Sequence, residues 1–545
     1  MLPSVSMRVS LFEWRPCRPG FRRVVVALGL VGLSLIATQC GKSPSEEEVQ
    51  KRAQSAPHIL LQEAFEKANQ EHNLDLLERV AFAQARTGDV SSALQTIQSA
   101  GGDGFRARRF VDISKELSAR GDIDGAIQAA SAIDAGSSAK KEALSDIAQA
   151  QANAGEIGDA LRTSGELSGY LRADVLQAVA LRQIQNNNIQ DAFKTLSSID
   201  VPGDVIHRSR ILIAIATKQS DTNRLTDALN TVALVEDGKW KASALSEVAQ
   251  SLAHRKQFIL ATKTADNIED PYTKAMTFTK LAQTRELLGD QSGAEKSREH
   301  AVELASSIPD AEYKNLALRA IAESAAGSHD WATALKVTSQ ISDMSHRIIA
   351  LTSIAVAQRA SGAIDASSMT LASATEVIPS IQDSTKRDNA YFQIVVMYAR
   401  VGDFQAAMAA ASHLADSQNI SQCLAFSELA IAQGGAGDAT SSVRSLESIQ
   451  VENANGLMSC TKEGSRLAAV EAAVSASHLD AAVKIARAGP EQCDLDKDIA
   501  SGFARVRDLH SAARWTYTRG SDVLEGCALL GMAEGAVNRN VGQEH

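Results

Sequence analysis

Gly121-Asp122-Ile123-Asp124-Gly125-Ala126 returns in related form along most of the chain. It reads Gly-Asp-Val-Ser-Ser-Ala at residues 88–93 and Gly-Glu-Ile-Gly-Asp-Ala at residues 155–160. Weaker copies begin at ten further residues: Asn187, Asn223, Lys256, Gly289, His329, Gly362, Gly402, Gly437, Ser477 and Arg507. The thirteen copies start 30 to 40 residues apart, and such a period indicates a repeat architecture.

Each copy is predicted to form a corner between two antiparallel helices. Before the corner at Gly155, Leu144, Ile147 and Ala148 have the i, i+3, i+4 spacing of one helix face. Glycine adopts the left-handed conformation that ends a helix at little cost. The aspartate after it can cap the next helix through its side-chain oxygen. Examples of this aspartate are Asp122, Asp290, Asp403 and Asp438.

The helix after the corner also has one apolar face. In the copy that begins at Gly121 this face consists of Ile123, Ala126, Ile127 and Ala130. A single hairpin cannot bury such a face, so the hairpins are expected to stack. The residue five after the corner is Ala in eleven copies and Ser in two, and the residue seven before it is Ala in ten. Small side chains there predict that paired helices cross closely.

The combination of a small residue, a Gly-Asp corner and an alanine five residues later resembles the tetratricopeptide repeat. The resemblance covers residues 74–535 and departs from the family at two positions. Where the family favours a large aromatic, this chain has Ala130, Ser164 or Ala265. Where it favours tyrosine, this chain has Gln84, Gln151 or Gln358. The resemblance implies an all-α fold, a right-handed α-solenoid superhelix of about 13 antiparallel helix hairpins, over residues 56–545.

The N-terminus is predicted to direct export. An apolar run at residues 24–37 is preceded by Arg15, Arg18, Arg22 and Arg23. A positive region before a short apolar region is typical of a secretory signal, and the run is shorter than the ~20 residues that span a bilayer. We therefore expect a signal peptide over residues 1–39.

Residues 37–41 resemble a bacterial lipoprotein box, in which the cysteine, here Cys40, becomes lipidated. Ala37 and Gln39 depart from the usual residues at their positions, and the alternative is an ordinary cleaved signal with an incidental cysteine. With a lipid on Cys40, residues 40–55 would hold the attachment site and a polar tether. Gly41 lacks the aspartate associated with inner-membrane retention, so the expected location is the periplasm, anchored to the outer membrane.

Four further cysteines lie in the last quarter of the chain: Cys423, Cys460, Cys493 and Cys527. An even number in an exported protein favours disulfides, and three pairings are possible. Hairpins of a solenoid touch only their neighbours, which favours Cys423–Cys460 and Cys493–Cys527. The alternative is four buried cysteines that act as small hydrophobic residues.

Several classes of function find no support in the sequence. A net charge of −10 provides no basic surface, so we expect no nucleic-acid partner. Metalloprotease, hydrolase-elbow and dinucleotide-binding motifs are missing, and so is paired CxxC spacing for zinc. We therefore expect no enzyme activity, no metal and no cofactor.

Function is then expected on the stacked surface. In tetratricopeptide-like solenoids the first helix of each hairpin lines the concave wall. Four polar residues stand six positions before their corners and are candidates for partner binding: Gln149, Gln250, Gln283 and Glu323. The resulting hypothesis is a noncatalytic scaffold or adaptor that binds other envelope proteins and contacts the membrane through its lipid anchor. The alternative is a regulatory or accessory subunit of an envelope or cell-wall-acting enzyme complex.

Overall fold

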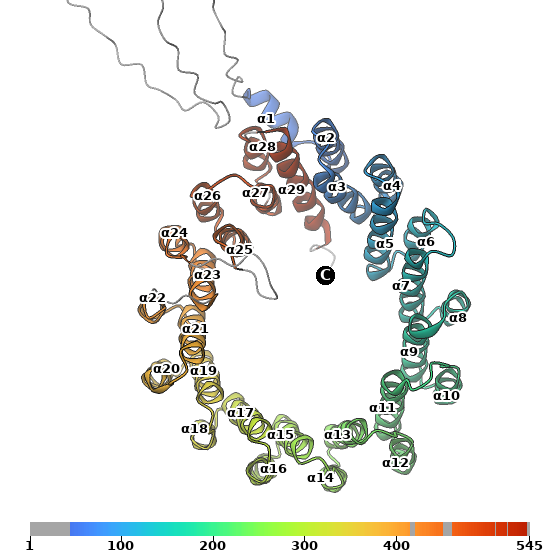
Figure 1. The fold of residues 1–545 in the computed structure, drawn as a ribbon, viewed down its shortest axis with the longest axis vertical. Coiled ribbons are helices and arrows are strands. Elements are labelled where there is room, and N and C mark those ends of the chain that lie inside the picture. The colour runs from blue at the N-terminus through green and yellow to red at the C-terminus, as the bar shows by residue number, and fades with distance from the viewer. Residues whose placement is uncertain (1–43, 415–419, 451–459, 507, 520, 542–545) are drawn as a thin grey trace, which may run out of the picture. The chain divides into compact units, whose positions relative to one another are not determined.

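The computed structural model describes residues 44–414, 420–450, 460–506, 508–519 and 521–541 (Figure 1). Within these ranges the chain forms 29 α-helices and one short 3-10 helix, and no β-strand. The all-α fold class predicted from the repeats is therefore confirmed, whereas the right-handed superhelix stays a prediction. The predicted signal peptide and Cys40 lie outside the described residues.

Two compact units make up the chain. Unit 1 combines the residues up to 83 with those from 489 onward, and unit 2 spans residues 84–488. The single repeat domain expected over 56–545 is thus divided, and both ends of the chain belong to unit 1. Each unit is described by itself below.

Unit 2 consists of helix hairpins in which a longer first helix precedes a shorter second helix. The first helices are α5 (Asp103–Ala119), α7 (Ser138–Ala154), α9 (Gly169–Gln185), α11 (Val205–Asp221), α13 (Gly238–His254), α15 (Pro271–Leu287), α17 (Ala311–Gly327), α19 (Met344–Ala360), α21 (Ser384–Arg400), α23 (Ile420–Gly435) and α25 (Lys462–Ser475). The second helices are α4 (Val90–Ser99), α6 (Ile123–Ser131), α8 (Ile157–Ser164), α10 (Ile189–Ser197), α12 (Leu225–Ala233), α14 (Phe258–Asp266), α16 (Gln291–Ser306), α18 (Trp331–Thr338), α20 (Ile364–Val377), α22 (Phe404–Ser412), α24 (Ala439–Glu447) and α26 (Leu479–Arg487). A 3-10 helix, η1 (Ile378–Ser380), follows α20.

The predicted corners are found in left-handed backbone conformation. Twelve of the thirteen corner residues have a positive φ, and the thirteenth, Arg507, lies outside the described residues. Five of the twelve are not glycine: Asn187, Asn223, Lys256, His329 and Ser477. At Gly121 the next amide, of Asp122, donates to the carbonyl of Leu117 at 3.0 Å, which satisfies an otherwise free helix-end acceptor. The Asp122 side chain in turn accepts from the amide of Gly125 and caps α6.

The small residues at the two crossing positions are buried in every hairpin. Ala148 before its corner and Ala160 after it, for example, expose none of their surface. Where serine replaces alanine, its hydroxyl donates to the facing backbone, as Ser442 does to the carbonyl of Ala430 at 2.8 Å. One expectation for the second helices was wrong. Ile127, assigned to the buried face of α6, is 42% exposed, whereas Ala126, Ala129 and Ala130 are buried.

A buried hydrogen bond joins the two helices of many hairpins. In five hairpins a glutamine four residues before the corner accepts the hydroxyl of a threonine eight residues after it: Gln84–Thr96, Gln151–Thr163, Gln183–Thr195, Gln219–Thr231 and Gln358–Thr370. Gln433 and Ser445 form the same bond at 2.8 Å. This pairing explains why glutamine stands where the tetratricopeptide family favours tyrosine, since a polar pair replaces a ring.

The longer repeats have a local cause. Two of the three copies that are 40 residues long contain a lengthened second helix, α16 with 16 residues and α20 with 14. Arg298 of α16 is buried, and its guanidinium pairs with Glu286 at 3.1 Å and Asp330 at 3.3 Å. The third long copy includes residues 451–459, which lie outside the described residues.

Unit 1 is built from helices of both chain ends. They are α1 (Glu46–Ala53), α2 (Pro57–Gln70), most of α3 (Leu74–Arg86), α27 (Cys493–Arg505), α28 (Leu509–Tyr517) and α29 (Asp522–Val541). The polar tether expected over residues 40–55 therefore includes a helix. Ser45 and Glu48 form a capping box that starts α1. Arg52 then pairs with Glu525 at 2.8 Å and lies over the ring of Tyr517 at 3.7 Å.

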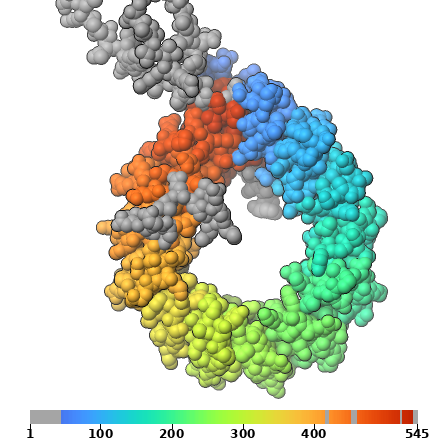
Figure 2. All heavy atoms as spheres, viewed as in Figure 1, coloured from blue at the N-terminus to red at the C-terminus, as the bar shows by residue number. Residues whose placement is uncertain are grey.

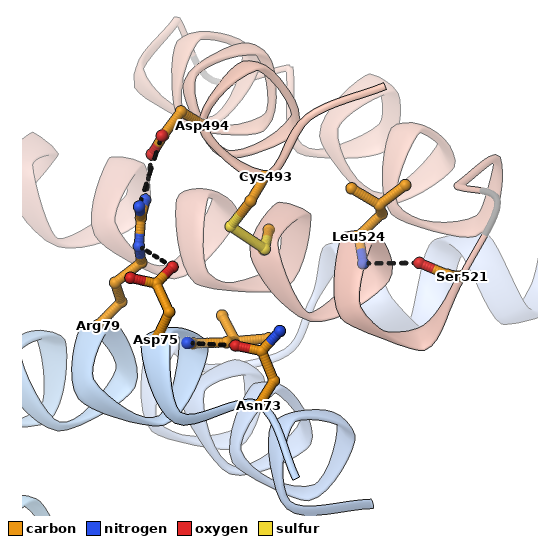
Figure 3. Close-up of a disulfide and its surroundings, with 9 residues drawn as sticks. Asn73, Asp75, Arg79, Cys493, Asp494, Ser521 and Leu524 are labelled. Atoms are coloured by element: carbon orange, nitrogen blue, oxygen red, sulfur yellow. Dashed lines mark hydrogen bonds and ion pairs between the residues drawn. A yellow bond between two sulfur atoms is a disulfide. The ribbon is translucent and has the colours of Figure 1, made fainter. Parts of the chain in front are cut away.

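Close helix contacts and a disulfide hold unit 1 together (Figure 3). Cys493, the first residue of α27, is bonded to Cys527 of α29 with a Cα–Cα distance of 5.3 Å. A Cβ at Gly531 or Gly535 of α29 would collide with the backbone of α27. Arg79 of α3 pairs with Asp494 of α27. Segments from opposite ends of the sequence therefore share one packed core.

Candidate partner-binding surface

The first helices of the hairpins form one continuous curved wall in unit 2. Figure 1 shows α5 to α25 on the inner side of the curve and the shorter second helices on its outer side. The nine first helices from α5 to α21 each contain 17 residues, so they present the same number of turns to the wall. In the space-filling view the stacked hairpins leave no break between neighbours (Figure 2). The expected concave wall is thus present in unit 2.

All four residues predicted to bind a partner lie on first helices of this wall, but their surroundings differ. Gln149 and Gln250 are half-buried and donate to serine hydroxyls one turn earlier, Ser145 and Ser246, both at 3.2 Å. Gln283 is exposed. Two of these three glutamines are therefore already hydrogen-bonded within their own helices, and the third is open to solvent.

Glu323, the fourth predicted residue, is half-buried on α17. Its carboxylate accepts the hydroxyl of Ser353 at 3.3 Å and lies 3.6 Å from the guanidinium of Arg319. Ser353 belongs to α19, so Glu323 joins two neighbouring hairpins. A partner that binds here would have to compete with these contacts.

A shallow groove lies on the wall between Gln149 of α7 and Gln250 of α13. It has a volume of about 430 Å³ and is lined by α9, α11 and α13. Its floor is apolar and consists of Leu181, Ile184, Ile213 and Ala214. Thr217 lines the groove as well. Leu181 and Thr217 both stand six residues before their corners, at the same place in the repeat as the four predicted residues. The groove was not predicted from the sequence, because only glutamine and glutamate were considered at the position six residues before the corner.

Charged side chains border the groove. Arg210, Lys218 and Asp221 of α11 line it together with Glu247 of α13. Asp221 accepts the hydroxyl of Ser251 at 2.6 Å, which fixes its carboxylate. The groove therefore combines an apolar floor with both signs of charge, a composition suited to a polypeptide side chain and its neighbouring backbone.

A histidine that lies between two aspartates connects two hairpins near the groove. Nδ1 of His207 lies 2.7 Å from Asp204, and Nε2 lies 2.8 Å from Asp174 of α9. A carboxylate accepts hydrogen bonds, so two of them favour the imidazolium form, in which both ring nitrogens can donate. Burial by itself would lower the pKa of His207, but the hydrogen bonds to Asp174 and Asp204 outweigh it and raise the pKa.

The disulfides have the pairing that the cysteine spacing favours. In unit 2, Cys423 of α23 is bonded to Cys460, just before α25, with a Cα–Cα distance of 6.1 Å. In unit 1, Cys493 is bonded to Cys527. Among the described residues no group of three or more His, Cys, Asp or Glu could hold a metal ion. None of the described helices combines the length and apolar character needed to cross a membrane.

The fold and wall define an α-helical repeat protein of stacked hairpins. No protein-family model and no curated protein matches the sequence. Among solved structures, Ton1535 from Thermococcus onnurineus NA1 is 13% identical with a TM-score of 0.22, over 66% of this chain and 98% of that one. The pentatricopeptide repeat protein PPR10 from maize is 12% identical with a TM-score of 0.28, over 81% and 72%. The human IFIT1 dimer with PPP-AAAA is 13% identical with a TM-score of 0.26, over 78% and 97%.

Proposed function

We propose that the chain is a noncatalytic scaffold or adaptor that binds partner polypeptides on the concave wall of unit 2. The observation that carries the proposal is the continuity of the wall, together with the apolar-floored groove on α9, α11 and α13. A wall of this kind offers a long surface on which an extended segment or a partner helix can lie. Neutral and charged polar groups flank the groove, so a bound backbone can find hydrogen-bond partners.

The second part of the proposal is a location in the bacterial envelope. The arginines before the apolar run, and Cys40 after it, support export and a lipid anchor. The disulfides Cys423–Cys460 and Cys493–Cys527 support an oxidising compartment, because thiols in the cytosol are kept reduced. Together these features favour a periplasmic repeat protein held at the outer membrane.

Capture from intact cells tests the proposal. A tagged full-length chain would be crosslinked and its partners identified by mass spectrometry, beside a variant with Leu181→Glu and Thr217→Glu. These two changes place carboxylates on the floor and border of the groove, whereas Lys263→Glu on the outer helix α14 is the matched control. We expect one reproducible set of envelope proteins, strongly reduced by the groove variant and unchanged by the control.

Three results would contradict the proposal. Capture of cytoplasmic proteins would contradict the location, and equal capture by the groove variant would contradict the binding surface. Turnover of a substrate by the purified chain would contradict the noncatalytic role. Capture of a cell-wall-acting enzyme, lost with the groove variant, would instead identify the chain as an accessory subunit of that enzyme.

A further inference from the structure

The helix α1 at the start of unit 1 is short and polar. It has eight residues, and only Val49 and Ala53 among them are buried. Isolated helices shorter than roughly 12–15 residues are marginal in water, because so few hydrogen bonds offset the cost of starting the helix. The helical state of α1 therefore depends on its contacts with the rest of unit 1.

Exposed charges hold the first turn of α1 on α28. The carboxylate of Glu46 contacts Nε2 of His510, and it accepts from the guanidinium of Arg514 at 2.8 Å. The side chains of Glu46 and Arg514 are 69% and 56% exposed. Ion pairs between such exposed groups contribute little to stability and are screened by salt. This end of α1 is therefore the one that detaches most easily.

A half-buried arginine holds the last turn of α1. The guanidinium of Arg52 donates to Glu525 of α29 at 2.8 Å and pairs with Glu63 of α2 at 3.2 Å. It also lies over the ring of Tyr517 of α28 at 3.7 Å. The Arg52 side chain is only 12% exposed, so salt screens its contacts less than those of Glu46. Docking of α1 thus combines one salt-sensitive contact with one that is largely shielded.

The position of α1 in the chain gives its docking a consequence. Between Cys40 and α1 lie five residues, 41–45, and residues 54–56 connect α1 to α2. If α1 detached and unfolded, the connection from Cys40 to α2 would lengthen to sixteen residues, 41–56. Fully extended, five residues span at most about 17 Å and sixteen residues about 55 Å.

We propose that α1 is a releasable helix that sets the length of the segment between Cys40 and unit 1. Docked, α1 keeps this segment short, and on release it roughly triples the reach of the segment. The next helix, α2, stays in place because Leu60 and Leu61 are buried in unit 1. Release is a property of unit 1 alone, and only the resulting distance from a membrane rests on the lipid anchor of the proposed function.

Hydrogen–deuterium exchange of the purified full-length chain tests the release. Backbone amides of α1 and α2 are followed by mass spectrometry in about 50 mM and about 1 M NaCl, because exchange reports local opening. Glu46→Gln removes the docked carboxylate, and Glu47→Gln is its matched control on the same turn. Arg52→Gln and Lys51→Gln form the same contrast at the other end. Within the part of the chain that the structure describes, Glu47 and Lys51 form no ion pair.

We expect the amides of α1 to exchange about threefold faster at high salt, whereas those of α2 keep their rate. At low salt, Glu46→Gln should accelerate exchange in α1 about threefold and Arg52→Gln at least about tenfold, with both controls within about twofold. Unchanged exchange in α2 shows that unit 1 stays folded in the variants.

Three results would overturn the inference. They are exchange in α1 that does not respond to salt, equal exchange of Glu46→Gln and Glu47→Gln, and acceleration of α2 together with α1 in every case. The last result would show that the two helices open as one body. None of these measurements needs a lipid on Cys40, so a failure of the proposed anchor would leave the exchange pattern unchanged and is distinguishable.

Discussion

Gly434 on α23 is a residue whose missing side chain is required by packing. A Cβ built there would lie 2.6 Å from the carbonyl oxygen of Ala469 on α25, which is backbone and cannot rotate away. Gly434→Ala should therefore lower the free energy of unfolding by about 1–3 kcal/mol. Gly158 on α8 has open space around it, so Gly158→Ala should be neutral or stabilising by up to about 1 kcal/mol. Urea unfolding of the two variants measures the difference, and equal stability would contradict the close contact.

His207 predicts a dependence of stability on pH. Its raised pKa means that the folded chain binds the proton more tightly than the unfolded chain, whose histidine has a pKa of about 6.5. The stabilisation is therefore fully present below about pH 6.5 and is lost as pH rises through the folded pKa. Above it, one of the contacts to Asp174 or Asp204 must break.

The melting temperature of the wild type relative to His207→Gln measures this effect. The difference between them should be largest at the acidic end of a series from about pH 5.5 to pH 8.5 and should shrink toward the alkaline end. His254→Gln, which replaces an exposed histidine on the neighbouring helix α13, is the matched control for the substitution itself. A constant difference for His207→Gln across the series would show that the imidazole is not protonated in the fold.

Each hairpin depends on a few positions, and the sequence shows most of them. The corners, the crossing alanines and the apolar faces of the first helices all follow from local chemistry. Their spacing therefore predicted all twelve corners that the structure describes, including those at Asn187 and Lys256. The Gln–Thr bonds were missed because the partners lie 12 residues apart on different helices and have no local signal. The same holds for α1, whose apolar residues Val49 and Ala53 are buried and which packs on α28 from the other chain end.

A double-mutant cycle on Gln219 and Thr231 tests the buried bond within a hairpin. The hydroxyl of Thr231 donates to Gln219 at 2.7 Å, and both side chains are buried. Gln219→Leu or Thr231→Val alone leaves a buried polar group without its partner and should cost about 1–3 kcal/mol. The double variant should cost less than the two single costs added together, with a coupling of about 1 kcal/mol. Strictly additive costs from urea unfolding would show that the bond contributes nothing specific.

At the scale of the whole molecule, the proposed location rests on the sequence of the N-terminal segment. If Cys40 carries a lipid, the wild type should sediment with membranes and incorporate a labelled fatty acid. Cys40→Ser should abolish labelling and move the chain to the soluble periplasmic fraction or leave the signal uncleaved, because stable anchoring needs the acyl chains. Cys493→Ser, which breaks a disulfide but not the anchor, is the control and should stay labelled. Equal labelling of wild type and Cys40→Ser would rule out lipidation at this residue.

The central claim is that partners bind on the inner side of unit 2. Photo-crosslinking in cells tests it most directly, with a photoreactive amino acid placed at Thr217 or Val356 on first helices, or at Lys263 or Met369 on second helices. We expect the two inner positions to yield the same reproducible partner adducts and the two outer positions to yield none of them. Adducts confined to the outer positions, or equal adducts from both sides, would contradict it.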